Sequence, residues 1–346
     1  MSSGRVAHSH GARIAGLVSC VPPRRIDNDH FVGRFGDKVA EVVKMTGVQT
    51  RHWVENGVTT SDLCERAANH LLDKLGWERD SVDGIIFVSQ TPDYRLPATS
   101  CTLQDRLGLP VGMLAFDISL GCSGYPYSLW LAMMMIQTGA AKRILLAVGD
   151  TSSIMNDADD RSTVLLFGDA GTVTAVEASD EADAAHFIVG TDGSGAANLI
   201  VPQGAFRTVE ATGKLEGRQL DKLFMDGGEV FNFTLKAVPA LIRDTIEAAG
   251  ETIEDYDLFL LHQANAFMIK HLAKKSKLPP EKVPINIDRF GNTSSATLPL
   301  LMTTDAAEAL STGERLVAMF GFGVGYSWAS ASMKIGPLKC VEHITL

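Results

Sequence analysis

Residues 116–150 read FDISLGCSGYPYSLWLAMMMIQTGAAKRILLAVGD, and this stretch decides the fold. A short apolar run leads into a GCSG turn, an apolar segment of helical length follows, and a second apolar run begins at Arg143. Short runs rich in Val, Ile and Leu that end at Gly, Asp or Thr predict buried strands. The stretch therefore predicts a strand, a helix and a second strand, with Cys122 at the start of the helix.

Other short apolar runs predict further strands. They are GIIFVSQ from Gly84, MLAFDIS from Met113, TVTAVE from Thr172, DLFLLHQ from Asp257 and RLVAMFG from Arg315. Segments of helical length alternate with them, and residues 61–76 predict a helix that Ser61 caps and Gly76 ends. This alternation predicts an α/β fold with mixed, mostly parallel sheets that helices cover on both faces.

The second half of the chain repeats this order of elements. DLFLLHQAN (257–265) is followed by INIDRFGNTSSA (285–296), a helical segment and RLVAMFGFG (315–323). A duplicated α/β unit would place Cys122 and Asn292 at related positions of two halves, with a short strand before Asn292.

The length suggests about two domains, which agrees with the repeat. We expect an N-terminal half, residues 1–180, that carries the nucleophilic cysteine. A C-terminal half, residues 181–346, would carry the histidine and the asparagine. The boundary is placed in ASDEADAA, which begins at Ala178, and the glycine-rich segment 190–217 is expected to be a long loop.

Composition narrows the classes of function. The net charge of -10 argues against a nucleic-acid surface, which needs excess Lys and Arg. The five cysteines are widely spaced and contain no C-x-x-C pair, so neither a disulfide framework nor a zinc site is indicated. No run approaches the roughly 20 apolar residues that span a bilayer, and the first residues lack a signal-peptide pattern. We therefore expect a cytoplasmic protein without a membrane or nucleic-acid partner.

Three polar residues follow predicted strands and could carry chemistry. Cys122 is expected at a helix N-terminus, where the helix dipole can lower a thiol pKa from about 8.5 toward 7. His262 ends the run DLFLLHQ, and its neighbours Gln263 and Asn265 could orient it. Asn292 lies before another helix start. Each residue also has a purely structural interpretation, as a buried cysteine, a satisfied core histidine and a helix cap.

Together the three residues suit a reaction that forms an enolate oxyanion. A thiolate accepts an acyl group and holds it as a thioester. Hydrogen-bond donors aimed at developing charge each contribute about 3 to 4 kcal/mol. The combination therefore favours acyl transfer through a cysteine thioester.

The strings DISLGCSG, LHQAN and RFGNTSSATLP resemble the three active-site motifs of the β-ketoacyl-acyl-carrier-protein synthase III family, in the same order. Further matches are TGVQTRH from Thr46, LLFGDAGT from Leu165, MDGGEVF from Met225 and FGVGYSWASA from Phe322. The resemblance covers roughly residues 12 to 335. It implies a thiolase-like fold with αβαβα layers.

The resemblance also implies a mechanism. Cys122 would take a primer acyl group, and malonyl on an acyl-carrier protein would then bind. His262 and Asn292 would hold the malonyl thioester oxygen while carbon dioxide leaves, and the carbanion would attack the acyl-cysteine. The backbone N–H groups of Cys122 and Val324 would form a second oxyanion hole, although Val324 replaces the usual glycine. The scheme needs no metal and no cofactor besides acyl-CoA or acyl-carrier-protein substrates, and it implies a homodimer.

Two departures from the family concern the binding of the primer, one at the coenzyme A site and one at the pocket for the acyl chain. Glu41 and Met45 stand where the family clamps the adenine of coenzyme A, while Arg161 matches. This favours a carrier-bound primer. Leu96 stands where the family closes the primer pocket across the dimer interface, and a leucine there would admit a longer acyl chain.

A third departure concerns docking of the acidic carrier protein. Lys274 and Lys275 match the family's basic residues, but Phe267 occupies the position of an expected arginine. Electrostatic docking through the lysine pair is expected, with a solvated lysine pair as the alternative interpretation.

Other functions of the same fold stay open. An acyltransferase could pass the cysteine-bound acyl group to an alcohol or amine in specialised metabolism. A non-catalytic partner subunit could bind acyl groups without turnover. Degradative thiolases and synthases of the chalcone type use related groups, but the asparagine motif disfavours the former, and the GNTSSA and HQAN strings disfavour the latter.

Overall fold

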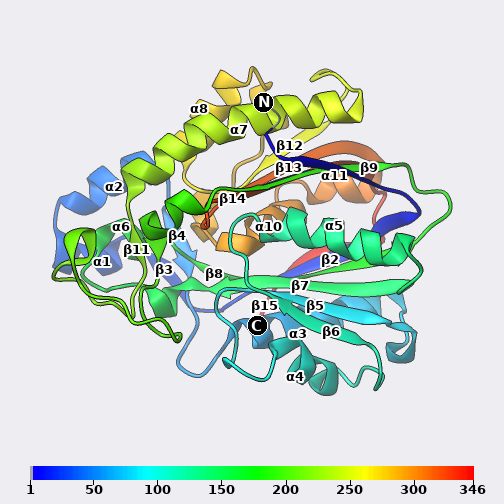
Figure 1. Cartoon of the computed structure of the whole chain (residues 1–346), viewed down its shortest axis with the longest axis horizontal. Helices are drawn as coiled ribbons and strands as arrows, with labels where there is room; N and C mark the ends of the chain where they lie inside the picture. Colours follow the sequence, from blue (N-terminus) through cyan, green and yellow to red (C-terminus); the bar gives the residue numbers. More distant parts are fainter. Residues whose placement is uncertain (1–2) are drawn as a thin grey trace.

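The structure, a computed structural model, describes residues 3–346 and contains two large sheets packed between layers of helices (Figure 1). The helices α5 (Gly124–Gln137) and α10 (Thr297–Thr303) lie between the sheets. One outer layer contains α3 (Thr60–Leu75) and α4 (Thr99–Arg106), and the other contains α7 (Gly227–Ala249) and α8 (Ala266–Lys275). The layers follow the expected order αβαβα.

The first sheet has six strands in the order β15-β2-β8-β7-β5-β6. Their bounds are β2 (Ala12–Val21), β5 (Gly84–Val88), β6 (Leu114–Ile118), β7 (Arg143–Thr151), β8 (Asp169–Ala178) and β15 (Cys340–Thr345). β5 pairs parallel with β6 and β7, and β15 pairs parallel with β2. β8 is antiparallel to both of its neighbours. The strands expected in this half are confirmed.

The second sheet has five strands in the order β1-β9-β14-β13-β12. Their bounds are β1 (Arg5–Ser9), β9 (Ala185–Thr191), β12 (Leu258–Leu261), β13 (Arg315–Gly323) and β14 (Ser327–Ile335). Within residues 3–346, β12 and β13 are its one parallel pair. The sheet is mixed as expected, but the prediction that most of its strand pairs are parallel is wrong. A short turn joins β13 to β14, and such a connection permits only antiparallel pairing.

The internal repeat is visible in the sheets. β5, α5, β7 and β8 correspond to β12, α10, β13 and β14, with matching parallel and antiparallel pairings. The prediction of a short strand before Asn292 is wrong, because the helix α9 (Ile287–Phe290) precedes this residue. The backbone of Asn292 instead forms an isolated bridge with Phe167 of the first half.

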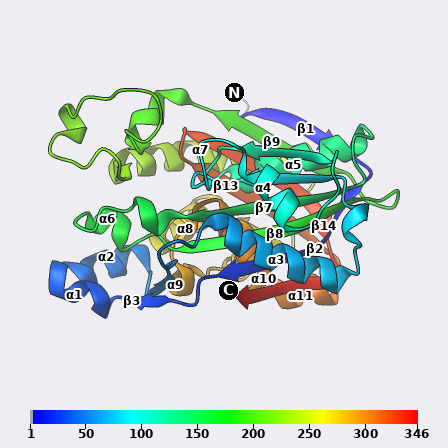
Figure 2. The same ribbon diagram turned by 90° about the horizontal axis from the view of Figure 1, so that it is seen from below.

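The chain passes from the first sheet to the second between Ala178 and Ala185, near the expected boundary. The two terminal strands each pair with the sheet of the other half. β1 pairs with β9 of the second sheet, and β15 pairs with β2 of the first (Figure 2). The division at residue 180 stays a prediction.

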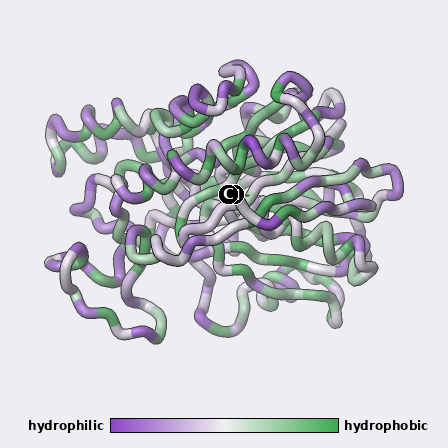
Figure 3. Tube along the Cα trace, turned by 45° about the horizontal axis from the view of Figure 1, so that its top comes forward, coloured by the Kyte–Doolittle hydropathy of each residue, from purple (hydrophilic) through white to green (hydrophobic). Residues whose placement is uncertain are grey.

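The largest group of buried side chains fills the space between the sheets. It includes Ile86 and Leu146 from the first sheet, Leu260 and Met319 from the second, and Leu129 from α5. Burying one such side chain contributes about 1.5 to 3 kcal/mol. α5 is apolar on nearly every side because sheets cover two of its faces. Figure 3 shows the hydrophilic residues concentrated on the outer helices and loops.

The helix expected over residues 61–76 is confirmed, with one correction at its start. Thr59, not Ser61, is the N-cap, and the Thr59 N–H donates to Asp62 at 2.8 Å in a capping box. Gly76 ends the helix in the left-handed conformation, as expected.

The remaining elements are short. They are β3 (Arg25–Asp27), α1 (Asp29–Phe35), α2 (Lys38–Thr46), β4 (Thr50–His52), α6 (Arg161–Val164), β10 (Leu199–Ile200), β11 (Phe224–Met225) and α11 (Ala307–Thr312). Four of them, α2, α6, β10 and β11, line the candidate site. The segment 190–217 forms a long excursion with little regular structure, as expected.

Candidate active site

A cavity of about 1260 Å³ brings Cys122, His262 and Asn292 together. The first half supplies the cysteine, and the second half supplies the histidine and the asparagine. Their exposed fractions are 7%, 2% and 5%, so bulk water is largely excluded from the three side chains. Low local polarity strengthens hydrogen bonds to a developing charge.

Cys122 lies in the turn that precedes α5, at the helix N-terminus as expected. Its Sγ atom is 4.0 Å from Oγ of Ser294. β13 passes close beside it, because a Cβ atom on Gly323 would lie 2.9 Å from Sγ. Glycine at this position keeps the sulfur accessible from the cavity.

The expected lowering of the Cys122 pKa is wrong. Burial, with the Asp150 carboxylate as a smaller cause, raises the pKa of the Cys122 thiol to about 12. Hydrogen bonds from Ser294 and from the backbone N–H groups of Cys122 and Val324 lower it, but they do not offset burial. Desolvation disfavours the charged thiolate. The resting nucleophile is therefore a neutral thiol.

The raised pKa predicts the pH dependence of Cys122 alkylation. At a pH far below the pKa of a thiol, the thiolate fraction grows about tenfold per pH unit. Iodoacetamide modification of Cys122, followed by peptide mass spectrometry, is therefore expected to accelerate about tenfold per unit between pH 7 and pH 9 without a plateau. A rate that levels off below pH 8 would contradict the raised pKa.

His262 directly follows β12, and its backbone N–H donates to the Phe320 carbonyl at 2.8 Å. Its Nδ1 atom lies 2.7 Å from Oγ1 of Thr297, and its ring packs edge-on against Phe322. Burial lowers the pKa of the imidazole to about 3, so the ring is neutral at physiological pH.

The expectation that Gln263 and Asn265 orient the histidine is wrong. Gln263 donates to the Leu261 carbonyl and accepts from the Asn286 N–H. Asn265 caps α8 by accepting from the Met268 N–H at 2.7 Å. Both side chains serve the local backbone, because each lies beside unsatisfied main-chain groups at a strand or helix end.

Asn292 is held from both halves. Its N–H donates to the Leu166 carbonyl at 2.9 Å, and its carbonyl accepts from the Gly168 N–H at 3.1 Å. Its Oδ1 accepts from the Ser294 N–H at 2.9 Å, which identifies the oxygen and leaves the NH2 group to donate. Gly291, at φ 68°, permits the turn, since a Cβ there would lie 2.6 Å from the Leu166 carbonyl oxygen.

Asp150 was not singled out from the sequence, although it ends a predicted strand. Its side chain is fully buried and accepts from the Gln90 N–H at 2.7 Å and from Ser89 at 3.2 Å. Its other oxygen accepts from the hydroxyl and the N–H of Ser295, at 2.6 and 3.2 Å. Asp150 thereby ties the first sheet to the loop that carries Asn292.

Four residues at which the sequence departs from or matches the resembled family line the cavity and are exposed, so they lie at its mouth. They are Glu41, Met45, Arg161 and Phe267. Arg161 forms no ion pair within residues 3–346. Phe267 is 53% exposed, and its ring centroid is 6.0 Å from that of Phe231. An aromatic contact thus stands at the position where the resemblance led us to expect an arginine.

Lys274 and Lys275 lie exposed in the last turn of α8. Lys275 has a structural partner, because its Nζ donates to the Leu235 carbonyl at 2.7 Å. Pro239, inside α7, lacks the N–H that would otherwise bond this carbonyl. Lys274 has no such bond among the described residues.

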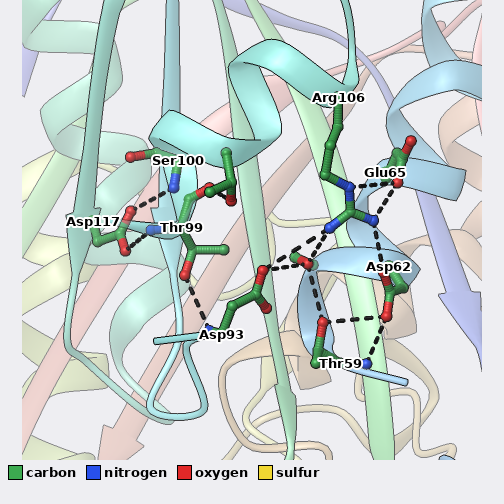
Figure 4. Close-up of polar contacts among 10 residues, drawn as sticks. Thr59, Asp62, Glu65, Asp93, Thr99, Ser100, Arg106 and Asp117 are labelled. Carbon is green, nitrogen blue, oxygen red and sulfur yellow. Dashed lines mark hydrogen bonds and ion pairs between the residues drawn. The ribbon is translucent and has the colours of Figure 1, made fainter. Parts of the chain in front are cut away.

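Leu96 does not line the cavity of its own chain and is 77% exposed. The loop that carries it is fastened at both ends (Figure 4). Asp93 forms an ion pair with Arg106 at 3.9 Å, and its N–H donates to Thr99 at 3.2 Å. The Thr99 N–H in turn donates to Asp117 at 2.7 Å. The loop therefore presents Leu96 to solvent from a defined position.

Residues 3–346 contain neither a cluster of metal-binding side chains nor a membrane-spanning helix. His, Cys, Asp and Glu side chains form no group of three that could hold a metal ion. No helix in this part of the chain combines the length and apolar character needed to cross a membrane.

The five layers and the meeting of cysteine, histidine and asparagine define a thiolase-fold condensing enzyme, an acyltransferase. Residues 116–193 match the family "3-Oxoacyl-[acyl-carrier-protein (ACP)] synthase III", and residues 246–335 match the C-terminal part of that family. The chain is 33% identical to a β-ketoacyl-[acyl-carrier-protein] synthase III of Xanthomonas axonopodis pv. citri, over 93% of this chain and 98% of that protein. The chain therefore belongs to the 3-oxoacyl-[acyl-carrier-protein] synthase III family.

Solved structures agree with this membership. A 3-oxoacyl-(acyl-carrier protein) synthase from Burkholderia xenovorans LB400 is 57% identical, with a TM-score of 0.99 and full coverage of both chains. A 3-oxoacyl-(acyl carrier protein) synthase III from Pseudomonas aeruginosa PAO1 is 30% identical, with a TM-score of 0.84 over 94% of this chain and 98% of that one. The expected thiolase-like fold is confirmed.

Proposed function

We propose that Cys122, His262 and Asn292 carry a decarboxylative Claisen condensation. The Cys122 sulfur attacks an acyl thioester, and the thiol proton passes to the departing donor thiol. Malonyl on an acyl-carrier protein then loses carbon dioxide, and its carbanion attacks the acyl-cysteine carbonyl. The carbon–sulfur bond breaks, and the Cys122 sulfur takes up a proton from solvent. The two thioester steps need no metal and no cofactor.

The observation that carries this proposal is that the three side chains, each nearly buried, line one cavity. The free NH2 of Asn292 and the His262 ring can donate to one thioester oxygen as negative charge develops there. The backbone N–H groups of Cys122 and Val324 both approach the Cys122 sulfur, where they can donate to the carbonyl oxygen of an attached acyl group as the second oxyanion hole. A cavity of this volume accommodates a pantetheine arm together with an acyl chain.

Membership of the family implies acyl-carrier protein and acyl thioesters as the substrates. Within these, we propose a carrier-bound primer, because Glu41 and Met45 offer no aromatic face for adenine at the mouth. Arg161 supplies a positive charge there for a phosphate of either donor. We also propose a homodimer, since the fastened loop around Leu96 exposes apolar side chains, including Tyr94.

Intact-protein mass spectrometry tests the proposal. The protein is incubated with acyl-CoA and acyl-carrier donors, and the mass added to Cys122 is followed with time. Malonyl-carrier protein is then added, and carbon dioxide release is measured. Loading followed by carbon dioxide release supports condensation, and faster loading from acyl-CoA refutes the carrier-bound primer. Loading without carbon dioxide release would favour acyl transfer to an alcohol or amine, and an unmodified Cys122 would favour a non-catalytic subunit.

The two lysines of α8 are expected to respond differently to substitution. Lys274→Met is expected to raise the KM for malonyl-carrier protein several-fold at low salt, because only a docking charge is lost. Lys275→Met is expected also to lower Tm by about 2 °C, since the Leu235 carbonyl loses its donor. Steady-state kinetics and thermal melts of the matched pair measure both effects. An unchanged KM in both variants would refute the docking role.

Leu96→Phe tests the proposed contribution of this loop to a partner's primer pocket. A bulkier ring is expected to reduce loading of an eight-carbon acyl group relative to acetyl by about tenfold. Competition between the two donors, read by the mass added to Cys122, measures the ratio. An unchanged ratio would place Leu96 outside the primer pocket.

A further inference from the structure

The single proton of the neutral His262 ring can lie on Nδ1 or on Nε2, and the condensation by itself does not determine which nitrogen carries it. Thr297, the first residue of α10, is 1% exposed. Its hydroxyl lies 2.7 Å from His262 Nδ1 and 3.1 Å from the Ser294 carbonyl oxygen. The other ring nitrogen, Nε2, has no hydrogen-bond partner within residues 3–346, and the ring lines the cavity.

The neutral ring and the hydroxyl have two consistent arrangements. A neutral imidazole carries one proton, and a hydroxyl donates one. If Thr297 donates to Ser294, it must accept from Nδ1, and Nε2 then faces the cavity as an acceptor. If Thr297 donates to Nδ1, the ring proton lies on Nε2, which then donates into the cavity.

The other partners of these groups favour the second arrangement. The Ser294 carbonyl already accepts from the backbone N–H of Thr297, so it does not depend on the hydroxyl proton. The contact of the hydroxyl with His262 Nδ1, at 2.7 Å, is the shorter of its two contacts. The contact with Ser294 is longer, and it joins residues three apart in one turn. Ser294 itself has φ 53°, a conformation that also directs its N–H to Asn292 Oδ1. Ser294 thus already positions the neighbouring amide donor.

We propose that Thr297 is a positioning residue that donates to His262 Nδ1 and thereby holds the ring proton on Nε2, where it faces the thioester oxygen. This inference rests on the proposed condensation. The Thr297 hydroxyl converts the histidine into a hydrogen-bond donor without giving it a charge. His262 and Asn292 then present two neutral N–H donors to the enolate oxygen. Loading of Cys122 does not need the Nε2 proton, because that step only moves the thiol proton to the donor thiol.

Two substitutions separate this role from simple packing. Thr297→Val keeps the shape of the side chain but cannot donate, and Thr297→Ser keeps the hydroxyl. Loss of one well-placed oxyanion donor costs about 10²-fold or more in rate. Thr297→Val is therefore expected to slow malonyl decarboxylation about a hundredfold while Cys122 loading changes less than about threefold. Thr297→Ser is expected to restore decarboxylation.

Nitrogen-15 NMR of histidine-labelled protein reads the ring proton directly, with the His262 signal assigned from the His262→Gln variant. The wild-type ring is expected to carry its proton on Nε2, and Thr297→Val is expected to move it toward Nδ1. A wild-type proton on Nδ1 would overturn the inference, as would equal slowing of loading and decarboxylation in Thr297→Val, or failure of Thr297→Ser to restore activity. If no donor acylates Cys122, the proposed function fails, but the NMR result still decides the position of the proton.

Discussion

Cys122→Ala is expected to abolish acyl-enzyme formation and to lower condensation by at least about a thousandfold. The reason is chemical, because Cys122 is the one cysteine among the described residues that line the cavity with His262 and Asn292. Intact mass after incubation with each acyl donor measures the loss of loading, and product formation from malonyl-carrier protein measures the loss of condensation.

Cys101→Ala provides the matched control, since Cys101 is a free, exposed thiol on α4. This variant is expected to load and condense normally. Cys122→Ala is also expected to retain slow malonyl decarboxylation, because His262 and Asn292 do not depend on the sulfur for their positions. Condensation by Cys122→Ala at a rate near that of the parent protein would contradict the assignment of the nucleophile.

Asn292→Asp is expected to reduce the rate of decarboxylation by about 10² to 10³-fold while leaving Cys122 loading nearly intact. An aspartate can still accept from the Ser294 N–H, so the loop keeps its hydrogen bond of 2.9 Å. The variant removes the NH2 donor and places negative charge beside a developing oxyanion. Single-turnover measurement of carbon dioxide release with pre-acylated protein isolates this step.

His262→Ala provides a second arm of the same experiment. If both donors serve one oxyanion, the double variant is expected to lose less than the product of the two single losses. Strictly multiplicative effects would indicate that the two residues act in separate steps. Equal slowing of loading and decarboxylation by Asn292→Asp would contradict an oxyanion role confined to the malonyl step.

Much of the fold follows from local patterns. Short Val, Ile and Leu runs correctly predicted strands such as β5, β7 and β13, because a strand covered on both faces must be apolar along its length. The ordered motifs around Cys122, His262 and Asn292 predicted the family, and the comparisons confirm it. Helix ends at which neighbouring residues compete for the cap position were less predictable, as the N-cap at Thr59 in place of Ser61 shows.

Long-range contacts account for most of the errors. The pairings of β1 with β9 and of β15 with β2 join segments far apart in the sequence, so no local pattern signals them. The bond from Lys275 to the Leu235 carbonyl likewise depends on α7 and α8 packing side by side. Thr297 and Asp150 were missed because their partners lie on other elements.

The sequence by itself determined the type of fold, the family and the three side chains of the candidate site, because apolar periodicity and ordered motifs are local properties. Only the tertiary structure decided the ionisation of the cysteine and the histidine. Burial raises the pKa of Cys122 to about 12 and lowers that of His262 to about 3, opposite to what a helix terminus suggested for the thiol. Desolvation depends on every neighbour that excludes water, and those neighbours come from both halves of the chain.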